Sequence, residues 1–192
     1  MYSLFGIGII EEEMNKIVIL VGNIGSGKTT YTHKLVVKGY VAIARDALRY
    51  MIGNGKYIFN PKLEPAIFSS ETEIIKRFME FGVDLVIDEV GINRLVRARY
   101  IVLAKTYNYQ IECVMLPKYS MQECVDRRMQ DPHGQPDRAL WESVWKKFNH
   151  RYEEPSLKEG FSKIIRLRKT KTKTLLGFNK MMKTIHNIRG IK

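Results

Sequence analysis

Residues 22–29, with the sequence GNIGSGKT, decide the fold of this 192-residue chain. They fit the pattern of a glycine, four free positions and then Gly-Lys-Ser/Thr, in which backbone N–H groups surround nucleotide phosphates. The preceding Lys16–Val21 is a short apolar run that predicts a buried strand, and residues 29–38 predict a helix that ends at Gly39. This motif needs a strand before it and a helix after it, and the sequence predicts both. We therefore expect a nucleoside triphosphate site here.

Each part of this loop has an expected role. The ammonium group of Lys28 should reach the β- and γ-phosphates, and the hydroxyl group of Thr29 should bind Mg²⁺. The positive end of the following helix should face the same phosphates. The residues expected to bind the nucleotide are Gly22, Asn23, Ile24, Gly25, Ser26, Gly27, Lys28, Thr29 and Thr30.

Strands and helices alternate along the rest of the chain. Further strands are predicted at 40–44, 84–88, 110–116 and 163–167, and further helices at 46–51, 61–81, 93–107, 121–129 and 137–152. Each crossover between parallel strands needs a helix. The pattern therefore predicts an α/β, three-layer P-loop NTPase fold, with a mainly parallel sheet covered by helices on both faces and a helical lid at about 120–140.

The formal charge of +12 is unevenly distributed. Ten of the 32 basic residues follow Phe161, where no acidic residue occurs, so residues 1–160 carry 22 basic against 20 acidic side chains. This balance excludes a basic DNA-binding body. We divide the chain into an N-terminal arm (1–15), the P-loop domain (16–167) and a basic tail (168–192). The tail is expected either to contact nucleic acid or to dock as an amphipathic helix, because four apolar residues in it have helical spacing: Leu175, Phe178, Met182 and Ile185.

Composition indicates a cytoplasmic protein. No run of about 18 apolar residues is present, so no membrane-spanning helix is expected. Cys113 and Cys124 have the pattern of ordinary buried thiols, and the four histidines share no metal-ligand spacing. We expect these histidines on the surface or packed in the core. The sequence does not indicate an oligomeric state.

Charged residues follow the strand predicted at 40–44. Asp46 comes directly after Arg45, and Arg49 lies three positions further on. A carboxylate beside the γ-phosphate can orient and deprotonate an alcohol, and a guanidinium can hold the phosphate that fixes the position of that alcohol. The alternative for Asp46 is a cap at the start of the following helix.

The phosphate-binding loop is followed along the chain by the Arg45, Asp46 and Arg49 group. In this order of features, roughly residues 16–167 resemble the phage-type 5′-hydroxyl polynucleotide kinases, within the wider group of small P-loop kinases. The resemblance implies that Asp46 accepts the proton of the attacking 5′-hydroxyl group, that Arg49 holds a phosphate of the acceptor strand and that Arg45 belongs to the same site. After its third strand the family has Asp-x-Thr-Asn, whereas residues 88–91 are Asp-Glu-Val-Gly here. Asp88 is therefore expected either to pair with Arg49 at the acceptor site or to act as an outer-sphere partner of Mg²⁺.

The resemblance also implies a lid arginine that closes on the transferring phosphate. Arg127 fits best by spacing, Arg128 is the alternative, and the turn-rich residues 131–136 suit a mobile lid. The resulting hypothesis is transfer of the γ-phosphate of ATP, with Mg²⁺, to the 5′-hydroxyl end of RNA or DNA, in nucleic-acid repair. A kinase of a small molecule would keep Lys28 and Asp46 without needing Arg49. A nucleotide-dependent binding module would hydrolyse the triphosphate without an acceptor.

Overall fold

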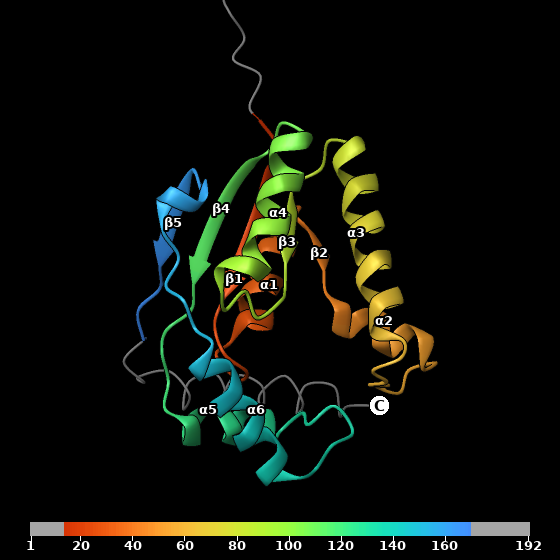
Figure 1. Ribbon diagram of the computed structural model, residues 1–192, viewed down its shortest axis with the longest axis vertical. Helices are drawn as coiled ribbons and strands as arrows, with labels where there is room; N and C mark the ends of the chain where they lie inside the picture. The colour runs from red at the N-terminus through yellow and green to blue at the C-terminus, as the bar shows by residue number, and fades with distance from the viewer. Residues whose placement is uncertain (1–13, 170–192) are drawn as a thin grey trace, which may run out of the picture.

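The computed structural model describes residues 14–169, so almost all of the 1–15 arm and of the 168–192 tail lies outside the described residues. Within them, five strands form one sheet in the order β2-β3-β1-β4-β5, and each neighbouring pair is parallel (Figure 1). The strands are β1 (Lys16–Val21), β2 (Val41–Ile43), β3 (Leu85–Ile87), β4 (Gln110–Met115) and β5 (Lys163–Arg166). The parallel sheet predicted from the sequence is confirmed.

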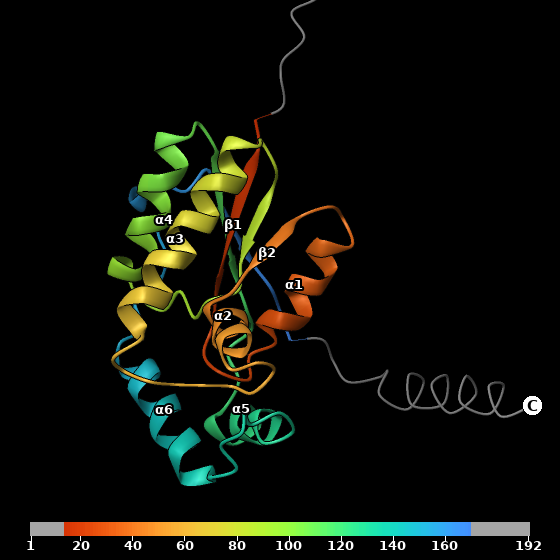
Figure 2. The same cartoon turned by 90° about the vertical axis from the view of Figure 1, so that its right-hand side faces the viewer.

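Helices cover both faces of this sheet. Figure 2 shows α3 and α4 on one face, α1 on the other, and α2, α5 and α6 gathered at the carboxyl end of the strands. Within residues 14–169, every helix lacks the combination of length and hydrophobicity that a bilayer crossing requires. The helices are α1 (Lys28–Val36), α2 (Arg45–Ile52), α3 (Glu64–Glu80), α4 (Arg94–Thr106), α5 (Met121–Arg128), α6 (Arg138–His150) and the 3₁₀ turn η1 (Leu157–Glu159).

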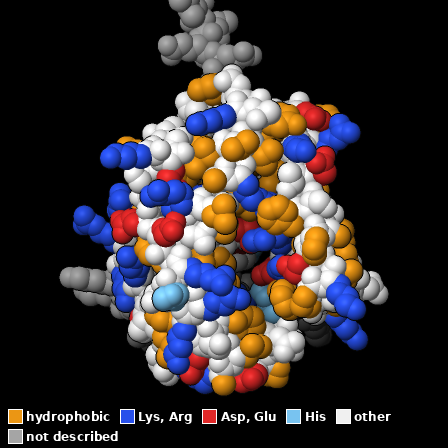
Figure 3. Space-filling model, viewed as in Figure 1, with side chains coloured by type: hydrophobic (Ala, Val, Ile, Leu, Met, Phe, Trp, Pro, Cys, Tyr) orange, Lys and Arg blue, Asp and Glu red, His pale blue; other side chains and the backbone are white. Residues whose placement is uncertain are grey.

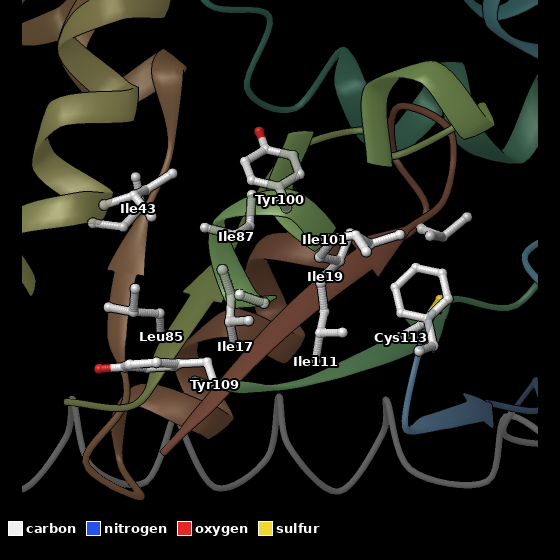
Figure 4. Packing of buried hydrophobic residues seen from close by; sticks show 14 of the residues in the cluster. Ile17, Ile19, Ile43, Leu85, Ile87, Tyr100, Ile101, Tyr109, Ile111 and Cys113 are labelled. Atoms are coloured by element: carbon white, nitrogen blue, oxygen red, sulfur yellow. The ribbon is translucent and has the colours of Figure 1, made fainter. Parts of the chain in front are cut away.

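The central strand β1 is buried on both faces. Ile17 and Ile19 are fully inaccessible and pack with Tyr100 of α4 (Figure 4), whereas Val18 and Leu20 belong to the cluster on the α1 side. Successive side chains of a strand point to opposite faces, so a strand covered on both faces is apolar throughout. Full burial of each such side chain contributes about 1.5–3 kcal/mol, which fixes the position of β1 and of the loop that follows it.

The N-cap residue of helix α2 is not the one that the sequence suggested as an alternative. The interpretation of Asp46 as a helix cap is wrong, because Ala44 is the N-cap residue and no side chain caps this helix. Asp46 lies in the first turn, where the helix dipole favours a carboxylate. Its side chain is therefore left for other partners. In contrast, α4 is capped by Asn93, whose side chain accepts a hydrogen bond from the backbone N–H of Val96 at 2.9 Å.

Candidate active site

The phosphate-binding loop joins β1 to α1 and depends on glycine. Gly25 and Gly27 have φ values of 62° and 95°, in the left-handed region that other residues rarely adopt. A Cβ atom on Gly25 would also lie 2.1 Å from the carbonyl oxygen of Cys124 in α5. Ile24 of the loop packs in one apolar cluster with Val125 of the same helix. The loop and α5 are therefore in direct contact.

Lys28 is the first residue of α1, and its ammonium group turns back over the loop. Nζ donates hydrogen bonds to the carbonyl oxygens of Gly22 at 3.1 Å and Asn23 at 2.9 Å. Burial lowers the pKa of Lys28 to about 8, and the negative charge of Asp88 is the largest effect that opposes it. Such a partly desolvated ammonium group gains strongly when phosphate oxygens approach it. Thr30, also predicted to bind the nucleotide, is exposed in the same turn.

Asp88 follows β3, the strand next to β1, and lies beside the first turn of α1. Burial raises the pKa of Asp88, whereas the Lys28 ammonium group and the hydroxyl groups of Thr29 and Thr32 lower it. A hydroxyl group and a carboxylate are the protein ligands that Mg²⁺ takes together with phosphate oxygens. The buried Oγ of Ser26 has no hydrogen-bond partner within the described part of the chain, and a phosphate oxygen would supply one. These residues fit a nucleoside triphosphate with Mg²⁺.

The two carboxylate oxygens of Asp46 have different neighbours. Oδ1 accepts hydrogen bonds from Nη1 of Arg49 at 2.6 Å and from the hydroxyl group of Tyr57 at 3.0 Å. Oδ2 lies 3.6 Å from Nδ1 of His133, and the side chain of Asp46 is 44% exposed. Two donors on Oδ1 fix the orientation of the carboxylate, so Oδ2 is the oxygen open to an incoming hydroxyl group.

Arg49 is held by carboxylates of α2 and α3. Besides its bond to Asp46, it donates from Nε and Nη2 to the two carboxylate oxygens of Glu64, at 3.0 and 2.5 Å. Its partners are thus Asp46 and Glu64, and the alternative in which Asp88 pairs with Arg49 is replaced by the position of Asp88 beside Thr29. These bonds use three of the five N–H donors of the guanidinium group, whose side chain is 10% exposed, so two donors remain.

Arg45 belongs to an ionic cluster at the start of α2. Its guanidinium group pairs with Glu89, which also accepts a hydrogen bond from the backbone N–H of Arg45 at 2.7 Å. Glu71 of α3, which has no exposed surface, lies 3.8 Å from Arg45 and pairs with Arg99 of α4. Burial raises the pKa of Glu71. The cluster ties the start of α2 to β3, α3 and α4, and therefore fixes where Asp46 lies.

Arg127, the lid residue predicted from spacing, lies against the phosphate-binding loop. Its guanidinium carbon is 3.8 Å from the centroid of the Tyr119 ring, and Nη1 donates to the carbonyl oxygen of Gly25 at 3.3 Å. Stacking on an aromatic ring and a bond to backbone hold this side chain at the outer edge of the loop. It therefore connects the lid to the loop.

Arg128 points to a different part of the site. Its Nη1 lies 2.7 Å from Nε2 of His133, and its guanidinium carbon is 5.0 Å from the ring centroid of Trp141 in α6. The positive charge of Arg128 contributes to the lowered pKa of Lys28. Figure 3 shows basic, acidic and histidine side chains meeting around a recess between the sheet and the lid helices.

Sequence reasoning missed four residues of this site. His133 was expected on the surface or in the core, yet its side chain is only 12% exposed and lies between Asp46 and the Tyr57 ring, 4.8 Å from that ring's centroid. Tyr57, His133 and Glu64 come from separate segments, so no spacing pattern links them. Glu89 did carry a signal, because it stands where the sequence departs from the pattern of the resembling family.

A family model that describes an AAA domain, AAA_33, matches residues 17–155. The chain belongs to the AAA_33 family. The match extends from β1 to the segment before η1 and includes every site residue described above. No curated protein matches the sequence of this AAA_33 member.

Solved structures show the fold of this AAA_33 domain. An APS kinase of Mycobacterium tuberculosis in complex with AMPPNP and APS is 16% identical, with 92% of this chain and 99% of that chain covered and a TM-score of 0.56. Kti12 of Chaetomium thermophilum in complex with ADP-AlF3 is 18% identical, with 87% and 97% covered and a TM-score of 0.54. A chain of the Pnkp1/Rnl/Hen1 RNA repair complex is 18% identical, with 78% and 47% covered and a TM-score of 0.58.

The chain spans less than half of the chains it matches in that complex, 47% in one structure and 39% in another, where the identity is 21%. Identities in this range establish the fold and leave the acceptor undetermined. The P-loop kinase fold is therefore shown, with a nucleotide-binding loop at the carboxyl end of its sheet.

Proposed function

We propose that this protein transfers the γ-phosphate of ATP to the 5′-hydroxyl end of RNA or DNA, in nucleic-acid repair. The observation that carries the proposal is the contact of Asp46 with Arg49 at 2.6 Å, beside the phosphate-binding loop. A carboxylate suits an alcohol, and the guanidinium next to it suits a phosphate. An acceptor that presents a hydroxyl group and a phosphate so close together matches the terminal nucleotide of a polynucleotide.

On the donor side, the loop and Lys28 bind the β- and γ-phosphates. Thr29 and Asp88 would hold Mg²⁺, which would neutralise part of the negative charge of the phosphates. Lys28 and one lid arginine stabilise the negative charge that develops on the transferring group. We assign this role to Arg128 in preference to Arg127, because Arg128 contacts His133, which lies 3.6 Å from Asp46, whereas Arg127 is stacked on Tyr119.

On the acceptor side, Oδ2 of Asp46 receives the proton of the 5′-hydroxyl group as the hydroxyl oxygen bonds to the γ-phosphorus. The bond from that phosphorus to the bridging oxygen breaks, and ADP leaves with the electron pair. Arg49 keeps Asp46 oriented and offers its two remaining N–H donors to the phosphate of the acceptor. His133 lies 3.6 Å from Oδ2 of Asp46, and its ring packs edge-on against that of Trp141.

The test is transfer of radiolabelled γ-phosphate from ATP, with Mg²⁺, to a panel of 5′-hydroxyl oligonucleotides, 3′-phosphorylated mononucleotides and mononucleosides. The matched variant is Asp46→Asn, which keeps the shape of the side chain. Label on the oligonucleotides that is lost in this variant supports the proposal. Label on mononucleosides alone, or ATP hydrolysis without a labelled acceptor, would overturn the acceptor assignment and favour a small-molecule kinase or a binding module.

A further inference from the structure

An apolar surface lies beside the acceptor side of the site, on the chain between α2 and the first turns of α3. Figure 3 shows hydrophobic side chains gathered along this side of the molecule. Concentrated exposed apolar area in a soluble protein marks an interaction site. Of the fourteen exposed large hydrophobic side chains in residues 14–169, six belong to this surface: Met51, Ile52, Ile58, Phe59, Leu63 and Phe68.

Two phenylalanines give this surface a specific chemistry. Phe59 is 62% exposed, and the guanidinium carbon of Arg49 lies 5.7 Å from its ring centroid. Phe68 is 44% exposed, and the guanidinium carbon of Arg99 lies 3.7 Å from its centroid. Arg45 also lies 6.0 Å from the Phe68 centroid, and the exposed part of each ring is where a second planar group can stack. Aromatic rings interleaved with cations are the platforms on which proteins stack the bases of single strands.

The arginines beneath these rings are held in place. Arg49 is fixed by Asp46 and Glu64, and Arg99 pairs with the buried Glu71. Because these ion pairs restrict the guanidinium groups, each ring rests on a rigid support. A base that stacks there requires little reorganisation of the protein, which preserves binding energy.

The position of Phe59 relates this surface to the reaction. Arg49 contacts both Asp46 and the Phe59 ring, so the ring is one side chain away from the carboxylate that receives the acceptor hydroxyl group. Lys56 and Lys62 are exposed on the same segment and add positive charge beside the rings. Positive charge next to the catalytic carboxylate favours a nucleic-acid strand over an apolar protein partner.

We propose that Phe59 stacks on the base that follows the 5′-terminal nucleotide, that Phe68 continues this path, and that the protein thereby selects single-stranded ends of two or more nucleotides. This inference rests on the proposed function and specifies its acceptor. The bases of a blunt duplex end are stacked on one another and paired, so their faces are not available to the rings.

The test compares Phe59→Ala, Phe59→Leu and Phe59→Trp with the control Phe81→Ala. Phe81 is 80% exposed and follows α3 at the opposite end of that helix, roughly 20 Å from Phe68 at 1.5 Å per residue. kcat and KM are measured at saturating ATP with 5′-hydroxyl single strands of one to eight nucleotides, each ending in a 3′-phosphate, and with an eight-base-pair blunt duplex.

For strands of two or more nucleotides, Phe59→Ala should raise KM about 5- to 150-fold, which corresponds to about 1–3 kcal/mol for one stacked base. Phe59→Leu should raise KM nearly as much because it keeps apolar area without a ring, and Phe59→Trp should keep KM near the wild-type value. With the mononucleotide, KM should stay within about twofold for all three variants. Phe81→Ala should behave as wild type with every acceptor.

A KM that rises equally for the mononucleotide and the octanucleotide in Phe59→Ala would overturn the inference, because the ring would then act only through Arg49. An unchanged KM, or a wild-type enzyme that prefers the blunt duplex, would overturn it as well.

If the wild type labels no oligonucleotide, the proposed function fails, and the inference is decided by anisotropy of a fluorescent single-stranded octanucleotide. Binding that is weakened in Phe59→Ala and kept in Phe81→Ala supports the path, whereas equal binding to all three proteins, or no binding, rejects it.

Discussion

The donor and acceptor sides of this site are built in different ways. The phosphate-binding part of the donor side is one continuous stretch, residues 22–30, in which backbone conformation and the ammonium group of Lys28 prepare the phosphate site. The proposed acceptor side is assembled from side chains of α2, the segment after it, α3 and the proposed lid, including Asp46, Arg49 and His133. The phosphate loop depends on its backbone, whereas each acceptor contact depends on a single side chain.

This difference shows where specificity arises in the molecule. Every donor for this fold presents the same phosphates, so a contiguous loop can bind them all. Acceptors differ in shape and charge, and side chains from separate segments can be exchanged without altering the loop. Substitutions on the two sides should therefore have separable effects on ATP binding and on transfer.

The largest separation is expected from Asp46→Asn. An amide cannot accept the hydroxyl proton, so kcat should fall about 10³-fold, within the usual range for a general base. The affinity for ATP, measured by isothermal titration calorimetry, should change less than about threefold because the phosphate loop is intact. The matched substitution on the donor side, Lys28→Met, should weaken both ATP binding and transfer. Unimpaired phosphoryl transfer by Asp46→Asn would contradict this separation between the donor and acceptor sides.

The second effect concerns the two lid arginines. Arg128→Ala should reduce kcat about 10²-fold, because one cation near the transferring phosphate is removed. Arg127→Ala should reduce kcat less than about tenfold, since Arg127 stacks on Tyr119 at the edge of the loop. Single-turnover rates for both variants, beside their lysine counterparts, measure the difference. Equal losses, or a larger loss for Arg127→Ala, would return the role to Arg127 as the sequence predicted.

The third effect is a dependence of ATP binding on pH that arises only on the donor side. Burial lowers the pKa of Lys28 to about 8 in the free protein, so its charged form is lost as the pH rises through 8. Phosphate groups are already ionised there, since their second pKa is about 6. If ATP binds only to the protonated amine, its dissociation constant should rise about tenfold per pH unit above 8.

Fluorescence titration with a nucleotide analogue between pH 7 and 9.5 measures this dependence. Lys28→Arg provides the control, because a guanidinium group stays charged across the whole range. Its dissociation constant should be weaker at pH 7 and nearly independent of pH. A wild-type protein with the same flat profile would show that Lys28 keeps its proton throughout.

The sequence predicts the donor side well for a physical reason. Residues 22–29 fold by local rules, because glycine conformation, strand burial and the start of a helix are properties of neighbouring residues. The three-layer fold followed from the same kind of evidence, since buried parallel strands such as Lys16–Val21 are apolar throughout. Element ends differed by one to three residues because tertiary contacts decide them.

The acceptor side could be predicted only in part. Asp46 and Arg49 could be proposed together because they are close in the sequence, and their side chains are in contact. Glu64 and His133 contact them across 15 residues in one case and 87 in the other, and a contact over such separations depends on how α3 and the lid pack. Arg128 contacts His133 for the same reason, and sequence spacing alone could not distinguish Arg128 from Arg127.

The smallest effect tests whether the fixed orientation of Asp46 matters. Tyr57→Phe removes one hydrogen bond to Oδ1 and leaves the bond from Arg49, so the carboxylate keeps its charge and loses part of its restraint. A bond to a charged group contributes about 1.5–3 kcal/mol, but only the share that differs in the transition state affects the rate. We therefore expect kcat to fall about fivefold, with ATP affinity unchanged and with the ring contact to His133 kept.

Measurement of kcat and KM for a 5′-hydroxyl octanucleotide checks this, and Tyr50→Phe, whose ring lies 5.4 Å from that of Tyr57, is the control. If Tyr57→Phe raises KM and leaves kcat unchanged, Tyr57 contributes to acceptor binding and does not orient Asp46, and the acceptor side then depends on fewer positioning contacts than we infer.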